Sequence, residues 1–187
     1  NAGVTSFKAV GFSAVFGDFV TIGGDFAFRK TQVSAGPPAV NRIEVVASNV
    51  TVSLTLGTVF SATASNGNLA LLIQENGTKA LQASLDDVTI TAGGFATVSA
   101  SSVTVKYNDS ASNVNLGTLN IDGVMAELNV NAGVTSFKAI GFSAVFADFV
   151  TIGGDFAFRK TQVSAGPPAV NRIEVVASNV TVSLTLG

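Results

Sequence analysis

The sequence predicts an all-β, elongated repeat architecture. The chain repeats itself with a long period, apolar and polar residues alternate along several segments, and only 12% of the 187 residues are charged. These observations favour a β-solenoid-like winding with hairpins, and the alternative is a continuous, rolled antiparallel sheet. Both architectures place repeat upon repeat along one axis.

Residues 131–187 repeat residues 1–57 almost letter for letter. Residue 131 corresponds to residue 1, so the period is 130 residues. We therefore predict one full repeat over residues 1–130 and the start of the next repeat over residues 131–187. Because neither end carries the atypical polar face of a terminal repeat, we expect this segment to belong to a longer array.

Only two positions differ between the copies, with Ile140 in place of Val10 and Ala147 in place of Gly17. The first change adds one methylene group and the second adds one methyl group. Changes this small indicate that both copies hold these side chains in nearly the same packing environment.

A shorter echo lies inside the 130-residue unit. Ala47–Val50 returns as Ala111–Val114, and Leu56–Thr58 returns as Leu116–Thr118. The order is kept and the offset is similar, which predicts two diverged halves of about 60–65 residues whose loops have changed in length.

The composition indicates a folded protein of low charge. Apolar residues make up 47% of the chain, and the charged share of 12% is about half the usual value. The abundant Val, Phe and Ile provide ample surface to bury, which argues against a disordered chain. The sequence has no 18-residue apolar run, so we expect no membrane insertion in this segment.

Alternation with a period of two predicts half-buried strands. Apolar residues occupy every second position in residues 50–56 and 103–107, with Thr, Ser or Lys between them. Such strands have one face on a core and one face in water. The 14 Phe residues, against one Tyr and no Trp, predict a dry interior stack of Phe side chains.

Turn-forming residues separate the predicted strands. Glu75–Thr78 lies between the strand candidates at residues 69–74 and 79–85, which predicts a hairpin. The Gly36–Pro38 segment likewise separates two further strand candidates. Antiparallel pairing is therefore expected within each repeat.

Three segments of the repeat, Asn66–Ile73, Glu75–Ser84 and Gly24–Thr31, resemble the repeats of giant bacterial cell-surface and secreted proteins, which are adhesin-like. Such proteins string many units between targeting and adhesive ends. The resemblance implies an extracellular or cell-surface location and a role as spacer or fibre. It supplies no catalytic residues.

The residue types that most often carry catalysis are missing. The chain has no His and no Cys, which excludes an imidazole base, a thiol nucleophile and disulfides. Asp86 and Asp87 form the only adjacent acidic pair, and neighbouring side chains of a strand point to opposite faces. Phe149 occupies the position of Asp87 in the other half-unit. We therefore predict no enzyme, no catalytic residue and no cofactor-binding residue.

Calcium is the one metal hypothesis that the composition leaves open, because Asp side chains in turns can supply oxygen ligands. The Gly-rich nonapeptide of calcium-binding β-rolls and the spacing of an EF-hand are missing, so the primary prediction is no metal site. The calcium candidates are Asp86, Asp87, Asp109 and Asp122.

The charge pattern limits the partners. The net charge is −2 and the ten basic residues are scattered, apart from Arg29–Lys30 and its copy Arg159–Lys160, so no nucleic-acid partner is expected. Arg29–Lys30 is expected beside a turn, where charge protects a strand edge from unwanted pairing.

The leading hypothesis is a structural repeat of a long extracellular fibre, sheath or surface spacer. Its partner would be the chain itself, through stacking of adjacent repeats and lateral assembly of chains. The alternative is an adhesin repeat in which loops such as residues 34–41 recognise a glycan or a partner cell, with avidity from the identical copies.

Overall fold

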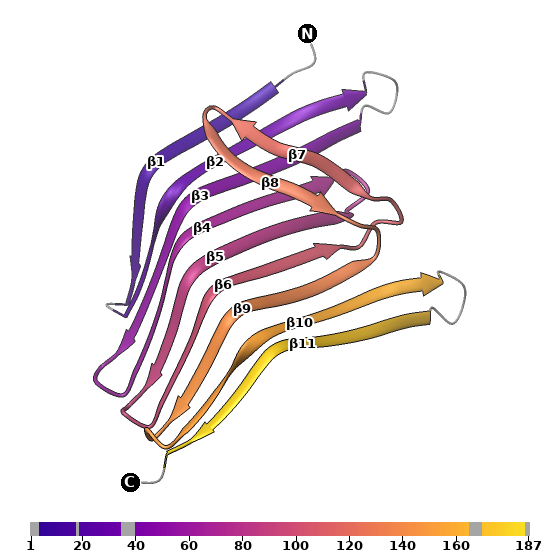
Figure 1. Ribbon diagram of the computed structural model, residues 1–187. Helices are drawn as coiled ribbons and strands as arrows, with labels where there is room; N and C mark the ends of the chain where they lie inside the picture. Colours follow the sequence, from indigo (N-terminus) through magenta and orange to yellow (C-terminus); the bar gives the residue numbers. More distant parts are fainter. Residues whose placement is uncertain (1–3, 18, 35–39, 165–169, 186–187) are drawn as a thin grey trace.

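A computed structural model describes residues 4–17, 19–34, 40–164 and 170–185. In these ranges the chain is all-β (Figure 1) and contains no helix that could cross a membrane. Nine strands form one open sheet, and two further strands form a separate hairpin. The strands are β1 (Val4–Phe16), β2 (Val20–Ser34), β3 (Val40–Leu56), β4 (Phe60–Gln74), β5 (Lys79–Ala92), β6 (Ala96–Asn108), β7 (Val114–Ile121), β8 (Val124–Val130), β9 (Val134–Phe146), β10 (Val150–Ser164) and β11 (Val170–Leu184).

The large sheet has the order β1-β2-β3-β4-β5-β6-β9-β10-β11, and every described pairing in it is antiparallel. Chain neighbours pair as hairpins, except that β6 pairs with β9 because the chain leaves the sheet to form β7 and β8 (Figure 1). The predicted all-β class and the antiparallel pairing are confirmed. The described pairings contain none of the parallel coil-on-coil ladders of a solenoid.

Tight turns form the β4–β5 and β9–β10 connections in agreement with their sequences. The predicted hairpin around Glu75–Thr78 is confirmed, since β4 ends at Gln74 and β5 begins at Lys79. In the β9–β10 turn, Ala147 and Asp148 have φ values of 46° and 60°, as in a type I′ turn. This turn type matches the right-handed twist of the flanking strands.

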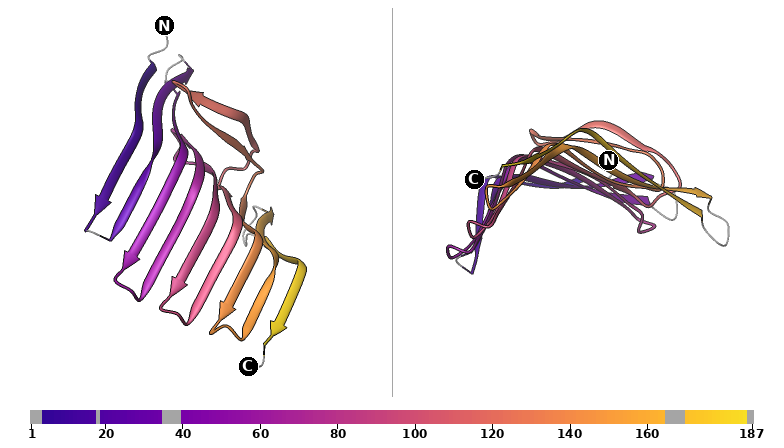
Figure 2. Two further views of the ribbon diagram at one scale, coloured as in Figure 1. Left: turned by 60° about the vertical axis from the view of Figure 1, so that its left-hand side comes forward. Right: turned by 60° about the horizontal axis from the view of Figure 1, so that its bottom comes forward.

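The strands bend near their middles, which gives the sheet an arched cross-section (Figure 2). Residues with left-handed backbone conformations lie at the bend, including Gly11 at φ 61°, Asn49 at φ 54° and Asp87 at φ 49°. The β1–β2 and β3–β4 registers also shift there, as expected for bulges. The Asp25 carboxylate joins two bent strands, because it accepts hydrogen bonds of 2.8 Å from Gly11 N and from Asn49 Nδ2.

The core lies between the β7–β8 hairpin and one face of the sheet. The hairpin contacts β2 to β6, and Figure 1 shows it lying across these strands. Its apolar residues pack on small and aliphatic residues of the sheet. The core cluster consists of Ala27, Val46, Ala70, Leu72, Ala80, Val114, Leu119, Ile121, Val124, Ala126, Leu128, Val130 and Val134.

The prediction of a Phe-filled interior is wrong. Within the described part of the chain no Phe belongs to the buried core, and Phe7 and Phe95 are each 66% exposed. A layer formed by a flat hairpin lying close to a sheet favours Ala, Val and Leu, because their side chains are short. The Phe side chains are instead partly or largely exposed, for example Phe7 and Phe12 on β1 and Phe26 and Phe28 on β2.

The second copy repeats the strands of the first, shifted by the period. After this shift β9 and β10 have the same bounds as β1 and β2, and β11 begins at Val170, the counterpart of Val40 in β3, but ends at Leu184. Val10 and Ile140, at one of the two differing positions, are both exposed. The internal echo falls in different local structures, since Ala47–Val50 lies within β3 and Ala111–Val114 leads into β7, so the two-halves prediction stays a prediction.

Candidate functional site

The four calcium candidates are spread over three parts of the fold. Asp87 accepts a 3.0 Å hydrogen bond from Ser65 Oγ, and Asp109 accepts a 2.6 Å bond from Lys79 N. Among the residues that the structure describes, no three acidic side chains are grouped so that they could hold a metal ion. Two of the four candidates are on β5, one follows β6 and one is in the β7–β8 turn: Asp86, Asp87, Asp109 and Asp122.

The loop proposed for glycan or cell recognition lies largely outside the described residues. Of residues 34–41, the structure leaves 35–39 undescribed, and in the second copy it leaves 165–169 undescribed. At the end of the loop, Asn41 N donates a 2.6 Å hydrogen bond to Glu75 Oε2. The binding hypothesis for this loop therefore stays a prediction.

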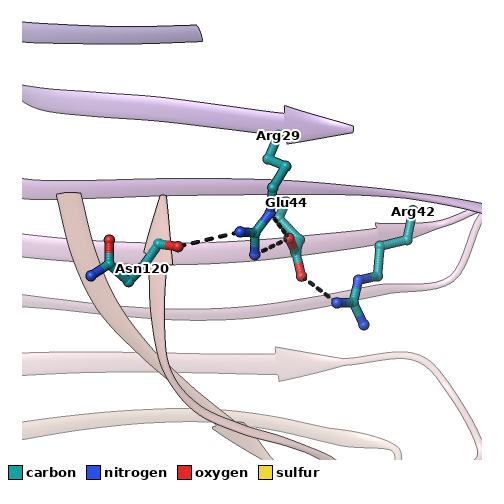
Figure 3. A network of polar contacts seen from close by, with 4 residues as sticks. All are labelled: Arg29, Arg42, Glu44 and Asn120. Atoms are coloured by element: carbon teal, nitrogen blue, oxygen red, sulfur yellow. Dashed lines mark hydrogen bonds and ion pairs between the residues drawn. The ribbon is translucent and has the colours of Figure 1, made fainter. Parts of the chain in front are cut away.

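The most distinctive polar arrangement lies where the hairpin covers β2 and β3. The Glu44 side chain is fully buried and accepts a 2.6 Å hydrogen bond from Arg29 Nε through its Oε2 (Figure 3). Its Oε1 lies 2.8 Å from a terminal nitrogen of Arg42. Arg29 and Glu44 are directly paired across the ladder, and Arg42 lies two residues from Glu44 on the same strand face.

Two guanidinium groups make the burial of this carboxylate tolerable. A buried carboxylate without partners would be strongly disfavoured, and hydrogen-bonded pairing with Arg offsets the loss of hydration. The Arg29 and Arg42 side chains stay 29% and 31% exposed, so the positive charges retain some hydration. Arg29 Nη1 also donates a 3.4 Å hydrogen bond to Asn120 O of the hairpin (Figure 3).

Long polar side chains of the sheet hold the backbone of the hairpin. Lys8 Nζ donates to Asp122 O at 2.5 Å, and Lys106 Nζ donates to Asn129 O at 3.0 Å. The buried Asn108 donates from Nδ2 to Val130 O at 3.2 Å. Because these bonds reach backbone carbonyls, they fix the position of the hairpin, while its apolar side chains supply the packing.

Buried and exposed residues alternate along β8 of the hairpin. Along β8 the buried residues are every second one, from Val124 to Val130, and Met125 and Glu127 face outward. Leu128 has no exposed surface. This alternation is the sequence signal of a one-sided strand, and β8 can therefore pack on the sheet only with this face.

The second copy of the β2–β3 face carries the same side chains without a covering hairpin. Arg159 Nε donates a 2.7 Å hydrogen bond to Glu174 Oε2, and Arg172 Nε lies 3.4 Å from Glu174 Oε1. The hydrogen bond from Arg159, with the charges of both arginines, lowers the pKa of Glu174 from its ordinary value. The ion cluster thus forms within the two strands, and the hairpin is not required for it.

Sequence reasoning missed this cluster. Arg29 was expected beside a turn at a strand edge, and that is wrong, because it lies within β2 and pairs with Glu44 of β3. Arg42 and Glu44 alternate along one strand, which was the available signal. The pairing with Arg29 could not be read from the sequence, because alternation within each strand does not fix the register between two strands.

Comparison with protein-family models, with curated proteins and with solved structures found no match. The described arrangement consists of two guanidinium groups, one carboxylate and several donors to backbone carbonyls. These hydrogen bonds join the hairpin to the sheet.

Proposed function

We propose that the chain is a structural repeat segment of a long extracellular fibre, sheath or surface spacer, stabilised by packing of one repeat on the next. The observation that supports this most is the ladder between β6 and β9, which runs from Tyr107–Thr135 to Ala96–Phe146. β6 belongs to the first repeat and β9 opens the second. The boundary between repeats is therefore an ordinary antiparallel ladder, which can be formed again at every further repeat.

The proposed array is elongated, and it is solenoid-like in that each repeat stacks on the one before it. Each repeat adds six strands to the sheet, from β1 to β6. At about 4.8 Å between neighbouring strands, one repeat would advance the array by about 29 Å. The repeats of giant bacterial surface proteins, which this chain resembles, supply the argument for a location outside the cell.

The hairpin gives this array lateral support. A single sheet one layer thick bends and twists easily, and its apolar faces stay in water. β7 and β8 contact five consecutive strands, so they would resist separation of these strands and cover part of one face. A spacer built from such units would gain length from the sheet and stiffness from the hairpins.

Small-angle X-ray scattering and electron microscopy of chains with increasing numbers of repeats test the proposal. We expect stiff rods whose length grows by about 29 Å with each 130-residue repeat. Globular beads joined by flexible segments would overturn the fibre proposal and favour the adhesin-module alternative. The 187-residue chain serves as the reference for the shortest form.

A further inference from the structure

The face that β10 and β11 expose is chemically the same face that β2 and β3 place under the hairpin. The two copies have identical sequences apart from Val10 in β1 and Gly17 in the turn after it, whose counterparts are Ile140 and Ala147. The structure therefore holds one surface in two states, covered and uncovered. The difference between the two states shows what the uncovered copy lacks.

The apolar part of this face changes most. Val46 is fully buried, whereas its counterpart Val176 is 60% exposed. Ala27 is 2% exposed, and its counterpart Ala157 on the interior strand β10 is only half-buried. The change at β10 is informative because this strand is paired on both sides, so its exposure comes from the open face and not from a free edge.

The polar part of the face is arranged for the same occupant. Glu174 holds its two arginines in position, yet its side chain is 34% exposed where that of Glu44 is fully buried. Lys138 stands at the position of Lys8, and Arg159 at that of Arg29. In the covered copy these two donors bind the backbone carbonyls of Asp122 and Asn120.

A shallow groove lies over this uncovered face, lined among others by Lys138, Ala157, Arg159, Glu174 and Val176. We propose that this groove is a docking site for a second copy of the β7–β8 hairpin, residues 114–130. The occupant is identified from the first copy, because there that hairpin covers β2 and β3, the counterparts of β10 and β11, and accepts a hydrogen bond from Lys8 of β1. This inference rests on the proposed array, in which every repeat supplies one such hairpin.

The docking would bury the second face as it does the first. Hairpin residues equivalent to Ile121 and Leu128 pack over the aliphatic side chains, and carbonyls equivalent to those of Asn120 and Asp122 accept from Arg159 and Lys138. The mode of recognition is therefore apolar packing with backbone hydrogen bonding. A hairpin of inverted alternation would present its polar face and would not fit.

Thiol labelling tests the inference, and the absence of native cysteine makes each introduced thiol a unique reporter. In the 187-residue chain, Val176→Cys should react rapidly, and Val46→Cys should react on the order of a hundredfold more slowly because it must wait for local opening. Protection of Val176→Cys already in this chain would overturn the proposal. This first arm needs no change of chain length.

The second arm extends the full chain after Gly187 with the sequence of residues 58–130, which completes the second repeat. Val176→Cys should then become as slow to react as Val46→Cys. Replacing the added copy of residues 114–130 by a short Gly-Ser linker should restore fast reaction. Ser53→Cys serves as the control. Ser53 is exposed near the end of β3, so its thiol should stay reactive throughout.

The two proposals can fail separately. If the extended chain lengthens as the array predicts but Val176→Cys stays reactive, the hairpin docking is wrong and the array stands. If the chain does not lengthen and Val176→Cys becomes protected, the hairpin docks on this face but the repeats do not form a continuous fibre.

Discussion

Glu44 and Glu174 have the same neighbours in the sequence and different surroundings in the fold. Both carboxylates are paired with two arginines, but only the Glu44 side chain is completely buried. Removing a charge from a buried ion cluster leaves its partners without compensation, whereas the same change at an exposed cluster is screened by water. The two glutamates therefore allow a buried and an exposed copy of the same ion cluster to be compared within one molecule.

We expect Glu44→Gln to lower the free energy of unfolding by about 2 kcal/mol, because Arg29 and Arg42 lose their charged partner under the hairpin. Glu174→Gln should cost less than about 1 kcal/mol. Urea denaturation of the two variants measures both values. Equal losses would contradict the assigned difference in burial.

At the scale of elements, the β7–β8 hairpin decides which sheet residues become core. β8 presents Leu128 and Met125 on opposite faces, with no exposed surface on the first and 51% exposure on the second. We expect Leu128→Ala to destabilise the protein by about 2–4 kcal/mol through loss of packing and formation of a cavity. Met125→Ala should change the stability by less than about 0.5 kcal/mol.

Thermal unfolding followed by circular dichroism compares these two variants with the parent chain. Both substitutions remove a long aliphatic side chain from the same strand, so strand propensity is nearly matched between them. A similar loss for both would mean that β8 does not pack on the sheet with the described face.

Hydrogen bonds at the bend of the strands shift the pKa of one aspartate in each copy. The Gly11 N–H and then the Asn49 side chain hold the pKa of Asp25 below its ordinary value of 3.8. In the second copy, Gly141 and Asn179 lower the pKa of Asp155 in the same way. A lowered pKa in the folded state means that the stabilisation is complete above about pH 4 and is lost as the pH falls through the folded-state pKa.

We therefore expect the free energy of unfolding to fall below about pH 4, and the double variant Asp25→Asn, Asp155→Asn to show a shallower fall. An Asn side chain has only one acceptor oxygen. It can accept from the glycine N–H or from the side chain of Asn49 or Asn179, whereas a carboxylate accepts from both with its two oxygens. Denaturation between pH 2 and 7 measures the slope. An unchanged slope in the double variant would mean that these two carboxylates are not the titrating groups.

At the scale of the whole molecule, the sheet is open, and β1 and β11 each have a partner on one side only among the described strands. Open edges with apolar side chains favour association of one chain with another. Val175 and Val182 of β11 are 72% and 71% exposed. We therefore expect β11, as one of the two open edges, to contribute to self-association.

A charge on this edge should weaken the association. Ser183→Lys places Lys on β11, and Ser53→Lys places it at the equivalent site on β3, which is paired on both sides. We expect Ser183→Lys to shift the onset of association to higher concentration by several-fold, and Ser53→Lys to leave it unchanged. Sedimentation velocity over a concentration series makes the comparison, and equal effects of the two substitutions would place the association elsewhere.

Much of the fold could be predicted from local sequence. Alternation over residues 50–56 is matched by alternating exposure along β3, and the turn at Glu75–Thr78 joins β4 to β5 as expected. These features depend on contacts between residues close in the chain. The Phe residues were misjudged because burial depends on which face receives a cover, and alternation alone does not indicate that.

The sequence by itself determined the all-β class, the 130-residue period and the one-sided pattern of β8, since each follows from residue spacing or from direct repetition. Only the tertiary structure decided that β7 and β8 leave the sheet, that β6 pairs with β9, and that Glu44 is buried while Glu174 is not. The physical reason is that pairing and covering are non-local. Identical segments differ in burial because different parts of the chain lie over them. The sequence of a segment does not specify which part of the chain will cover it.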